Sequence, residues 1–195
     1  MGRASKAIVT TGMLLMAISG CSNNVTKTVA IDQHVFNVPK KYLLEGTIPW
    51  LPASQHDGLM FYVNPEAPLT ARNSVLIQST ATSCPPDVLR GSFPLASACR
   101  AAAQRDASEA ETELEKVHPQ NDPTQWEYRV KTGKSQGVVV ASCSAMADGN
   151  GLCHSFGNYG GLVYSVGLRD SEIGRLPEIR RRVHDLLFSW EKPSH

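Results

Sequence analysis

Apolar and polar residues alternate through much of the second half of the chain. Trp126, Tyr128 and Val130 are separated by polar residues, which places the three side chains on one face of a predicted strand. Turn residues at 147–151 and 158–161 separate runs of the same kind, so we expect antiparallel neighbours joined by short turns. The further strands are predicted over 138–143, 152–156 and 162–168.

Short apolar runs in the first half also predict strands. Two follow each other closely at 29–31 and 34–38, and Pro39 ends the second because proline cannot donate a hydrogen bond to a neighbouring strand. Two more lie at 59–63 and 74–79, and we expect them to pair as antiparallel neighbours. The first half therefore contributes strands to the same kind of sheet as the second.

The end of the chain repeats apolar residues at helical spacing. Pro177 suits a first helical turn and Pro193 marks the end of the helix. The apolar stripe, which we expect to pack on a sheet, consists of Leu176, Ile179, Val183, Leu186, Leu187 and Trp190. The opposite, polar face, for which membrane binding is the alternative role, carries Arg180, Arg181, Arg182 and Asp185.

Residues 94–118 are rich in Ala and Glu, with no Gly or Pro beyond Pro94, and so favour a helix. Its apolar stripe is thin and consists of Leu95, Cys99, Ala102, Ala103, Ala110, Leu114 and Val117. An acidic run covers the other faces, and is either a solvated surface or a docking surface for a basic partner. Strands, a helical insertion, further strands and a closing helix together predict an α+β fold: one domain over 29–195, built mainly on an antiparallel sheet with a C-terminal amphipathic helix.

The first residues carry an export signal. Arg3 and Lys6 precede an apolar run at 7–18 that is too short for a permanent membrane span, so residues 1–20 are predicted to be a cleaved signal peptide. The sequence Ile-Ser-Gly-Cys ending at Cys21 resembles the bacterial lipobox, whose cysteine receives lipid; an ordinary secretory signal with a chance cysteine is the alternative. Residues 21–28 would form a lipidated tether. Ser22 in place of aspartate favours the outer membrane, facing the periplasm.

Four further cysteines remain after Cys21. An even number in an oxidising compartment predicts two disulfides, and local spacing favours Cys84 with Cys99 and Cys143 with Cys153. Metal binding is the alternative, but neither a C-x-x-C motif nor an adjacent histidine pair is present, so we expect no metal.

Charge and motifs give little sign of other chemistry. Nineteen basic and 18 acidic residues leave a net charge of +1, which does not favour binding to nucleic acid. We find no nucleophile elbow, zinc-protease motif or P-loop, and therefore predict neither catalytic residues nor a cofactor, with an unfamiliar hydrolase as the alternative. The six histidines lie far apart in the sequence, and His154 is the one we expect to be buried.

One segment carries a family resemblance. Asp32, His34, Phe36, Val38-Pro39 and Tyr42-Leu43, followed by 48–52 and the strand at 59–64, resemble the periplasmic immunity lipoproteins that accompany type VI secretion lipase effectors, in particular phospholipase D-type effectors. The resemblance implies a protein that is not an enzyme and that binds a secreted phospholipase toxin and blocks its active site. A structural or assembly lipoprotein of the envelope is the alternative.

Stiff loops are the favoured contact sites for such a partner, because they lose little entropy on docking. Trp50 lies between two prolines, and two predicted turns supply the remaining loop candidates, which are Asp148, Asn150, Asn158 and Tyr159. A second candidate is the acidic run, whose carboxylates could mimic a lipid phosphate. It consists of Glu109, Glu111, Glu113 and Glu115.

Overall fold

The computed structural model describes residues 25–44, 58–91, 94–104, 113–118, 122–133, 135–147 and 149–193. Several predictions concern residues outside these ranges: the signal peptide over 1–20, and the roles of Cys21, Trp50, Glu109, Glu111 and Asp148. Among the described helices, none is long and apolar enough to cross a membrane.

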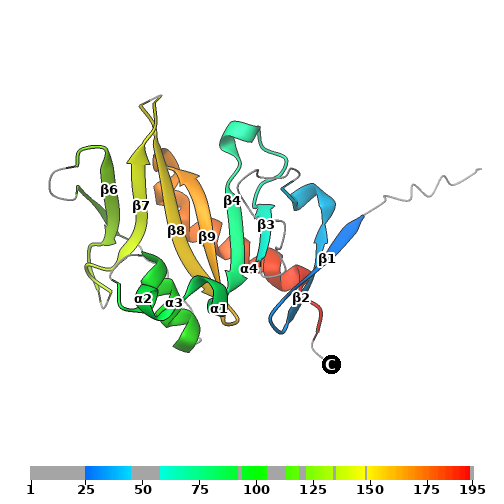
Figure 1. The fold of residues 1–195 in the computed structure, drawn as a ribbon. Helices are drawn as coiled ribbons and strands as arrows, with labels where there is room; N and C mark the ends of the chain where they lie inside the picture. The colour runs from blue at the N-terminus through cyan, green and yellow to red at the C-terminus, as the bar shows by residue number, and fades with distance from the viewer. Residues whose placement is uncertain are drawn as a thin grey trace, which may run out of the picture.

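The centre of the fold is an antiparallel sheet with the order β3-β4-β9-β8-β7-β6-β5 (Figure 1). Strands β6 to β9 form a meander, and β4 pairs with β9. The strands span β3 (Gly58–Tyr62), β4 (Ser74–Ser79), β5 (Leu114–Val117), β6 (Gln125–Val130), β7 (Val139–Ala145), β8 (Gly151–Tyr159) and β9 (Leu162–Arg169). The α+β class, with an antiparallel sheet and a closing helix, is confirmed.

One face of the sheet is covered by α4 (Leu176–Trp190), which follows the 3-10 helix η3 (Asp170–Arg175). The six apolar residues predicted to form its stripe are the buried residues of this helix. A separate two-stranded sheet, β1 (Thr26–Ile31) and β2 (His34–Pro39), stands beside α4 and the β3 edge. Phe36 and Phe61 are fully buried, and the Phe61 ring lies edge-on to Trp190 at 5.0 Å, so both sheets share one core.

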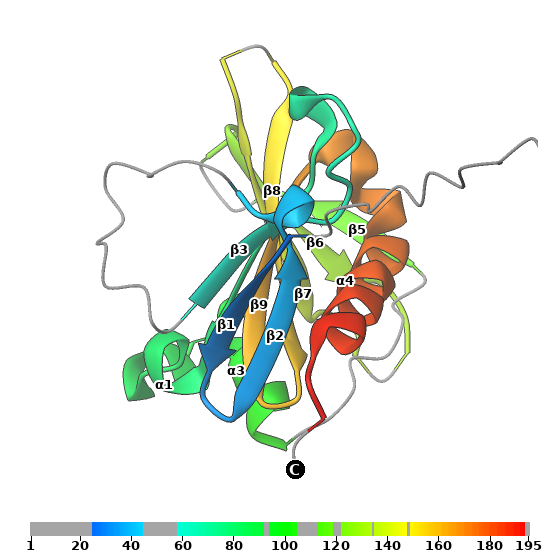
Figure 2. The ribbon, with the colours of Figure 1, turned by 90° about the vertical axis from the view of Figure 1, so that its right-hand side faces the viewer.

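Three helices lie on the opposite side of the large sheet from α4 (Figure 2). They are α1 (Thr80–Ser83), α2 (Pro86–Leu89) and α3 (Pro94–Gln104). Cys99 and Ala102 of α3 pack against Val163, and the disulfide between Cys84 and Cys99 joins α3 to the residue after α1. Two short 3-10 helices complete the described elements: η1 (Lys40–Tyr42) and η2 (Leu69–Ala71).

The large sheet has two ends that carry different connections. At the upper end in Figure 1, β7 ends, β8 begins and β9 ends, and Leu152 pairs with Arg169. The connection between β3 and β4, which contains η2, lies at this same end because Ser74 pairs with Gly167. At the lower end, Tyr159 pairs with Leu162 across the β8–β9 turn.

The helix predicted over 94–118 is present over Pro94–Gln104 and is wrong at its far end, residues 114–117. Residues Leu114–Val117 form the edge strand β5, in which Leu114 pairs with Val130 and Val117 with Glu127 of β6. Pairing with an existing strand outweighs the weak helix preference of a segment whose apolar stripe was thin. The start of the domain also differs, because β1 begins at Thr26, inside the segment expected to be a tether.

Three side chains take places that the sequence did not predict. His154 is exposed, and the buried histidine is His34, which is 9% exposed. Arg180 does not lie on the solvent face of α4; its guanidinium donates hydrogen bonds at 2.9 Å to the Ser155 hydroxyl and the Phe156 carbonyl oxygen. A long arginine side chain at the flank of the apolar stripe can reach the sheet, which helical spacing alone does not show.

Candidate partner-binding site

The β7–β8 hairpin projects from the upper end of the sheet (Figure 1). Its tip is closed by hydrogen bonds from the Met146 amide to the Asn150 carbonyl oxygen at 2.7 Å and from the Gly149 amide to the Met146 carbonyl oxygen at 3.0 Å. Below the tip, Cys143 and Cys153 are cross-strand partners joined by a disulfide, as predicted. Met146 is 43% exposed, so this stapled hairpin presents an apolar side chain to solvent.

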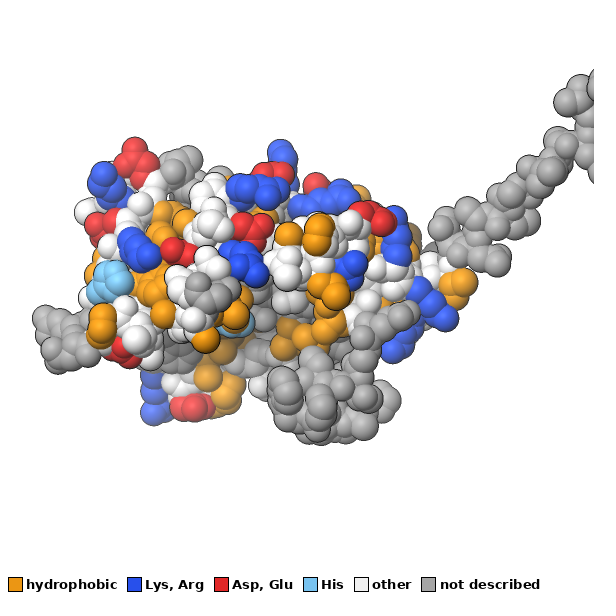
Figure 3. Space-filling view, turned by 90° about the horizontal axis from the view of Figure 1, so that it is seen from above, with side chains coloured by type: hydrophobic (Ala, Val, Ile, Leu, Met, Phe, Trp, Pro, Cys, Tyr) orange, Lys and Arg blue, Asp and Glu red, His pale blue; other side chains and the backbone are white. Residues whose placement is uncertain are grey.

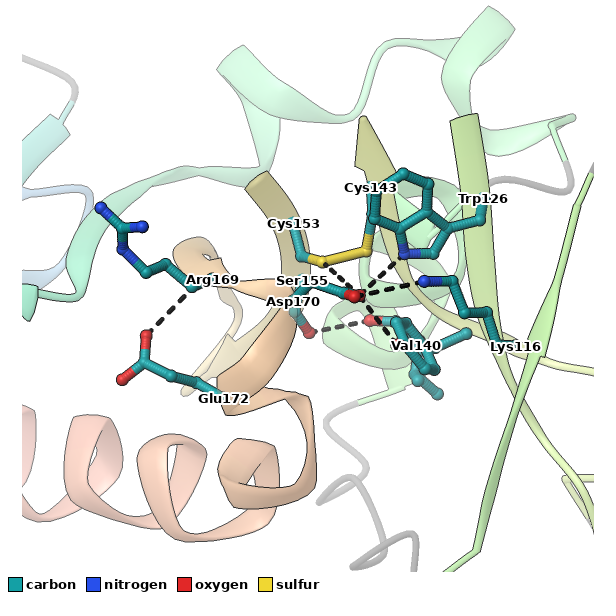
Figure 4. Close-up of a disulfide and its surroundings, with 10 residues drawn as sticks. Lys116, Trp126, Val140, Cys143, Cys153, Ser155, Arg169, Asp170 and Glu172 are labelled. Atoms are coloured by element: carbon teal, nitrogen blue, oxygen red, sulfur yellow. Dashed lines mark hydrogen bonds and ion pairs between the residues drawn. A yellow bond between two sulfur atoms is a disulfide. The ribbon is translucent and has the colours of Figure 1, made fainter. Parts of the chain in front are cut away.

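Asp170, the first residue of η3, lies beside the Cys143–Cys153 disulfide at the base of this hairpin and binds side chains of the neighbouring strands (Figure 4). One carboxylate oxygen accepts hydrogen bonds from Trp126 Nε1 and from the Tyr128 hydroxyl, both at 2.8 Å. The other oxygen accepts from Lys116 Nζ at 3.2 Å, and this ammonium also lies 4.0 Å from the centre of the Trp126 ring. One carboxylate therefore connects β5, β6 and η3.

The electrostatics of this cluster keep Asp170 ionised. Burial by itself would raise the pKa of the Asp170 carboxyl. Hydrogen bonds from Tyr128, Trp126 and Lys116 lower this pKa by more than burial raises it, so it lies below its ordinary value. Burial, followed by the hydrogen bond to Asp170, raises the pKa of Tyr128 to about 12. The carboxylate and its three donors thus form a fixed polar support at neutral pH.

Gly151, the first residue of β8, is required by the same packing. A Cβ atom at this position would lie 2.3 Å from the Trp126 ring and 2.9 Å from Asp170 Cβ. Trp126 therefore lies directly on the hairpin backbone, just below the tip.

The cluster does not offer a metal site. Among the described residues, the Cys143 and Cys153 sulfurs and an Asp170 oxygen lie within 4.8 Å of one another. The two sulfurs are bonded to each other, so neither is the thiolate that a metal ion requires.

The predicted contact residues fall into three places. Asn150 is exposed at the hairpin tip, and Glu113 and Glu115 are exposed at and beside the edge strand β5. Asn158, in contrast, is 5% exposed, and Tyr159 is half-buried; both belong to the lower end of β8 rather than to a turn. Because little of either side chain reaches solvent, Asn158 and Tyr159 do not belong to the exposed contact surface.

Tyr159 instead takes part in a polar clamp, defined here as His34, Tyr159 and Glu191. The Glu191 carboxylate accepts from the Tyr159 hydroxyl at 2.7 Å and lies 2.5 Å from His34 Nδ1. His34 Nε2 lies 2.9 Å from the Gly160 carbonyl oxygen, so both ring nitrogens face an oxygen acceptor. The clamp fastens β2 and the residue after α4 to the β8–β9 turn.

The charges of the clamp follow the same logic as at Asp170. Burial would raise the pKa of Glu191, but hydrogen bonds from Tyr159 and His34 lower it below its ordinary value. Burial and the bond to Glu191 raise the pKa of Tyr159. The sequence pattern did not reveal this clamp, since its members lie on three separate segments; the only signal was a histidine within a strand, at His34.

The fold is similar to that of a protein of known structure. No protein-family model matches the chain, and no curated protein matches it by sequence. Among solved structures, the chain is similar to an immunity protein of the Stenotrophomonas maltophilia type IV secretion system, with a TM-score of 0.50 and 12% identity. The likeness covers 87% of this chain and 94% of that chain, and at this identity it concerns the fold.

Proposed function

We propose that this protein is an immunity protein that binds a secreted antibacterial toxin and inhibits it. The observation that carries the proposal is the fold likeness to an immunity protein, which extends over 87% of this chain and 94% of the other. The resemblance of the segment from Asp32 to Leu43 to immunity lipoproteins supports the same role independently of the fold. In this role the protein acts by binding and needs no catalytic residue of its own.

The protein would act in the periplasm, attached to the outer membrane by lipid at Cys21. The lipobox-like sequence before Cys21 supports the anchor, and the two disulfides are typical of an oxidising compartment. Metabolic labelling with a fatty-acid analogue tests the anchor. We expect label in the wild-type protein and none in Cys21→Ala; equal labelling of both, or of neither, contradicts it.

The proposed toxin is a phospholipase, and this part rests on the sequence resemblance alone. The resemblance favours a type VI effector, whereas the protein of similar fold belongs to a type IV system. The gene beside an immunity gene usually encodes its toxin, so the adjacent gene's product is the probe for both questions.

The described surface supports inhibition by covering the toxin's substrate entrance. The β7–β8 hairpin presents Met146 and Asn150, and its disulfide and backbone hydrogen bonds lower the conformational entropy that is lost on binding. Glu113 and Glu115 on the β5 edge add acidic groups, which could occupy the electropositive site that a lipid phosphate needs.

The test is an activity titration with purified components. The adjacent gene's product is assayed for phospholipid hydrolysis in vesicles while this protein is added in steps, and complex formation is followed by size-exclusion chromatography. We expect inhibition to be complete near one equivalent, and no hydrolysis by this protein alone. No inhibition at excess together with no complex contradicts the proposal, and hydrolysis by this protein alone indicates an enzyme instead.

A further inference from the structure

A second element at the upper end of the sheet presents an apolar side chain. It is the loop over 64–73 that connects β3 to β4 and contains η2, called the Leu69 loop here. Leu69 is 73% exposed, although the neighbouring Asn73 is only 3% exposed. Leu69 therefore lies in the exposed middle of the loop, residues 68–71, while the end of the loop at Asn73 is packed on the domain.

Hydrogen bonds within the loop fix its shape. The Asn64 side chain accepts from the Asn73 amide and donates to the Ala71 carbonyl oxygen, both at 2.8 Å. Arg72 Nε donates to the Ala67 carbonyl oxygen, also at 2.8 Å. Such bonds stiffen a loop that contains no regular strand or α-helix.

Two further hydrogen bonds fasten the loop to the rest of the upper end. Arg169, at the end of β9, donates from Nε to the Thr70 carbonyl oxygen at 2.9 Å. The Asn73 side chain donates to Glu172 in η3 at 3.0 Å. The Leu69 loop is therefore fastened to η3, whose first residue, Asp170, lies beside the hairpin disulfide.

The charges around Leu69 indicate the kind of surface that would meet it. The Arg72 guanidinium lies 5.1 Å from the centre of the Tyr62 ring, and neither Arg72 nor Arg169 forms an ion pair with another described residue. Figure 3 looks onto the upper end and shows hydrophobic side chains lying among charged side chains of both signs, Lys and Arg as well as Asp and Glu. An apolar anchor flanked by arginines complements an apolar recess with an acidic rim.

We propose that Leu69 is the anchor by which this protein docks to its toxin, and that it enters an apolar recess with an acidic rim on that protein. This proposal rests on the proposed function and names the part of the surface that performs it. A lipid-degrading enzyme has such an apolar recess where acyl chains enter. The pre-formed loop loses little conformational entropy when Leu69 is buried, and Met146 on the hairpin adds a second apolar contact from the same end.

The experiment compares three variants in the activity titration, with the adjacent gene's product as the probe. Leu69→Asp places a charge in the recess, and Leu69→Met keeps an apolar side chain of similar volume. Phe188→Asp is the matched control, because Phe188 on α4 is 78% exposed but belongs to a different surface. Both positions are exposed, so we expect unchanged thermal unfolding in all three variants.

The expected result is a binding constant at least tenfold weaker for Leu69→Asp, with Leu69→Met and Phe188→Asp close to the wild type. We also expect wild-type affinity to fall as salt is added, because salt screens the arginines from the acidic rim. If Leu69→Asp inhibits the toxin as well as the wild type does, the Leu69 proposal alone is overturned. The same holds if Leu69→Asp and Phe188→Asp weaken inhibition equally. Affinity that is independent of salt overturns the acidic rim, and failure of the wild type to inhibit overturns the proposed function and this inference together.

Discussion

The two ends of the large sheet are built on similar polar clusters but present different surfaces. At the lower end, Glu191 binds Tyr159 and His34, and all three side chains turn inward. At the upper end, Asp170 binds Trp126, Tyr128 and Lys116 in a comparable way. The upper end, however, also carries two connections between strands that each present an exposed apolar side chain, Leu69 and Met146.

This difference indicates that the lower end serves stability and the upper end serves binding. The lower end joins β1–β2, the β8–β9 turn and the end of α4, so its interactions serve the stability of the domain. The upper end uses its hydrogen bonds to fix the loops that present two apolar side chains, Leu69 and Met146, to solvent, where a partner can cover them. Variants at the lower end should therefore change folding, and variants at the upper end should change toxin binding.

The largest expected effects come from the disulfides. Removing Cys143–Cys153 or Cys84–Cys99 by paired alanine substitutions should each lower the free energy of unfolding by about 3 kcal/mol, since the bridges close loops of 10 and 15 residues. Urea unfolding measures this. Only the loss of Cys143–Cys153 should also weaken binding to the adjacent gene's product, because that bridge braces the hairpin. Equal weakening by both pairs would break the distinction between the ends.

The pairing itself is tested by mass mapping of the unreduced protein. We expect peptides linking Cys84 with Cys99 and Cys143 with Cys153. Crossed pairs would contradict the assignment, and four free thiols would remove both bridges.

Gly160 at the lower end offers the next largest effect. Gly160 has a φ of +55°, and a Cβ atom added there would lie 2.7 Å from His34 Cε1. The His34 ring is held in place because both of its nitrogens are hydrogen-bonded. Gly161 has a φ of +92° with nothing within 4 Å, so Gly161→Ala carries the backbone strain without the clash. We expect Gly160→Ala to be less stable than Gly161→Ala by about 2 kcal/mol in urea unfolding. Equal stabilities of the two variants would show that the His34 ring moves away from the added Cβ atom.

Acid should weaken the carboxylate clusters at both ends. The pKa of Glu191 is lowered from 4.5 and that of Asp170 from 3.8, so each ionised carboxylate stabilises the fold above those values. This stability is lost as pH falls through the lowered pKa of the folded state, when protons bind more readily to the unfolded chain. Glu191→Gln should cost about 2 kcal/mol at pH 7, since the amide cannot accept from both partners in the same way, and should flatten the acid loss. An unchanged acid profile in Glu191→Gln would exclude the clamp as its source.

The smallest effect is expected at the β5 edge. Glu113→Lys with Glu115→Lys should leave the unfolding temperature nearly unchanged, because both side chains are exposed. If these carboxylates face the phosphate site of the toxin, association should slow roughly threefold or more, which stopped-flow mixing measures. An unchanged association rate would confine the contact to the two loops of the upper end.

Regular periodicity was the part of the fold that the sequence could predict. The α4 stripe from Leu176 to Trp190 and strand β4 appear as expected, because many residues repeat the same pattern. Strand β5 was missed since four residues carry too little periodicity, and its structure depends on pairing with β6.

The candidate site could be predicted only in part for a related reason. The hairpin disulfide followed from local spacing of Cys143 and Cys153, two residues close in sequence. The Leu69 loop and the Asp170 cluster depend on contacts between distant segments, such as Asn73 with Glu172 and Lys116 with Asp170, and these exist only once the sheet has formed.

A survival assay in bacteria tests the central claim most directly. The adjacent gene's product is exported to the periplasm of cells that carry this protein as the wild type, as Leu69→Asp with Met146→Asp, or as Phe188→Asp, with equal protein levels checked by immunoblot. We predict that the wild type and Phe188→Asp restore growth and that the double variant does not. Growth arrest in cells carrying the wild type, or full protection by the double variant, would contradict the account.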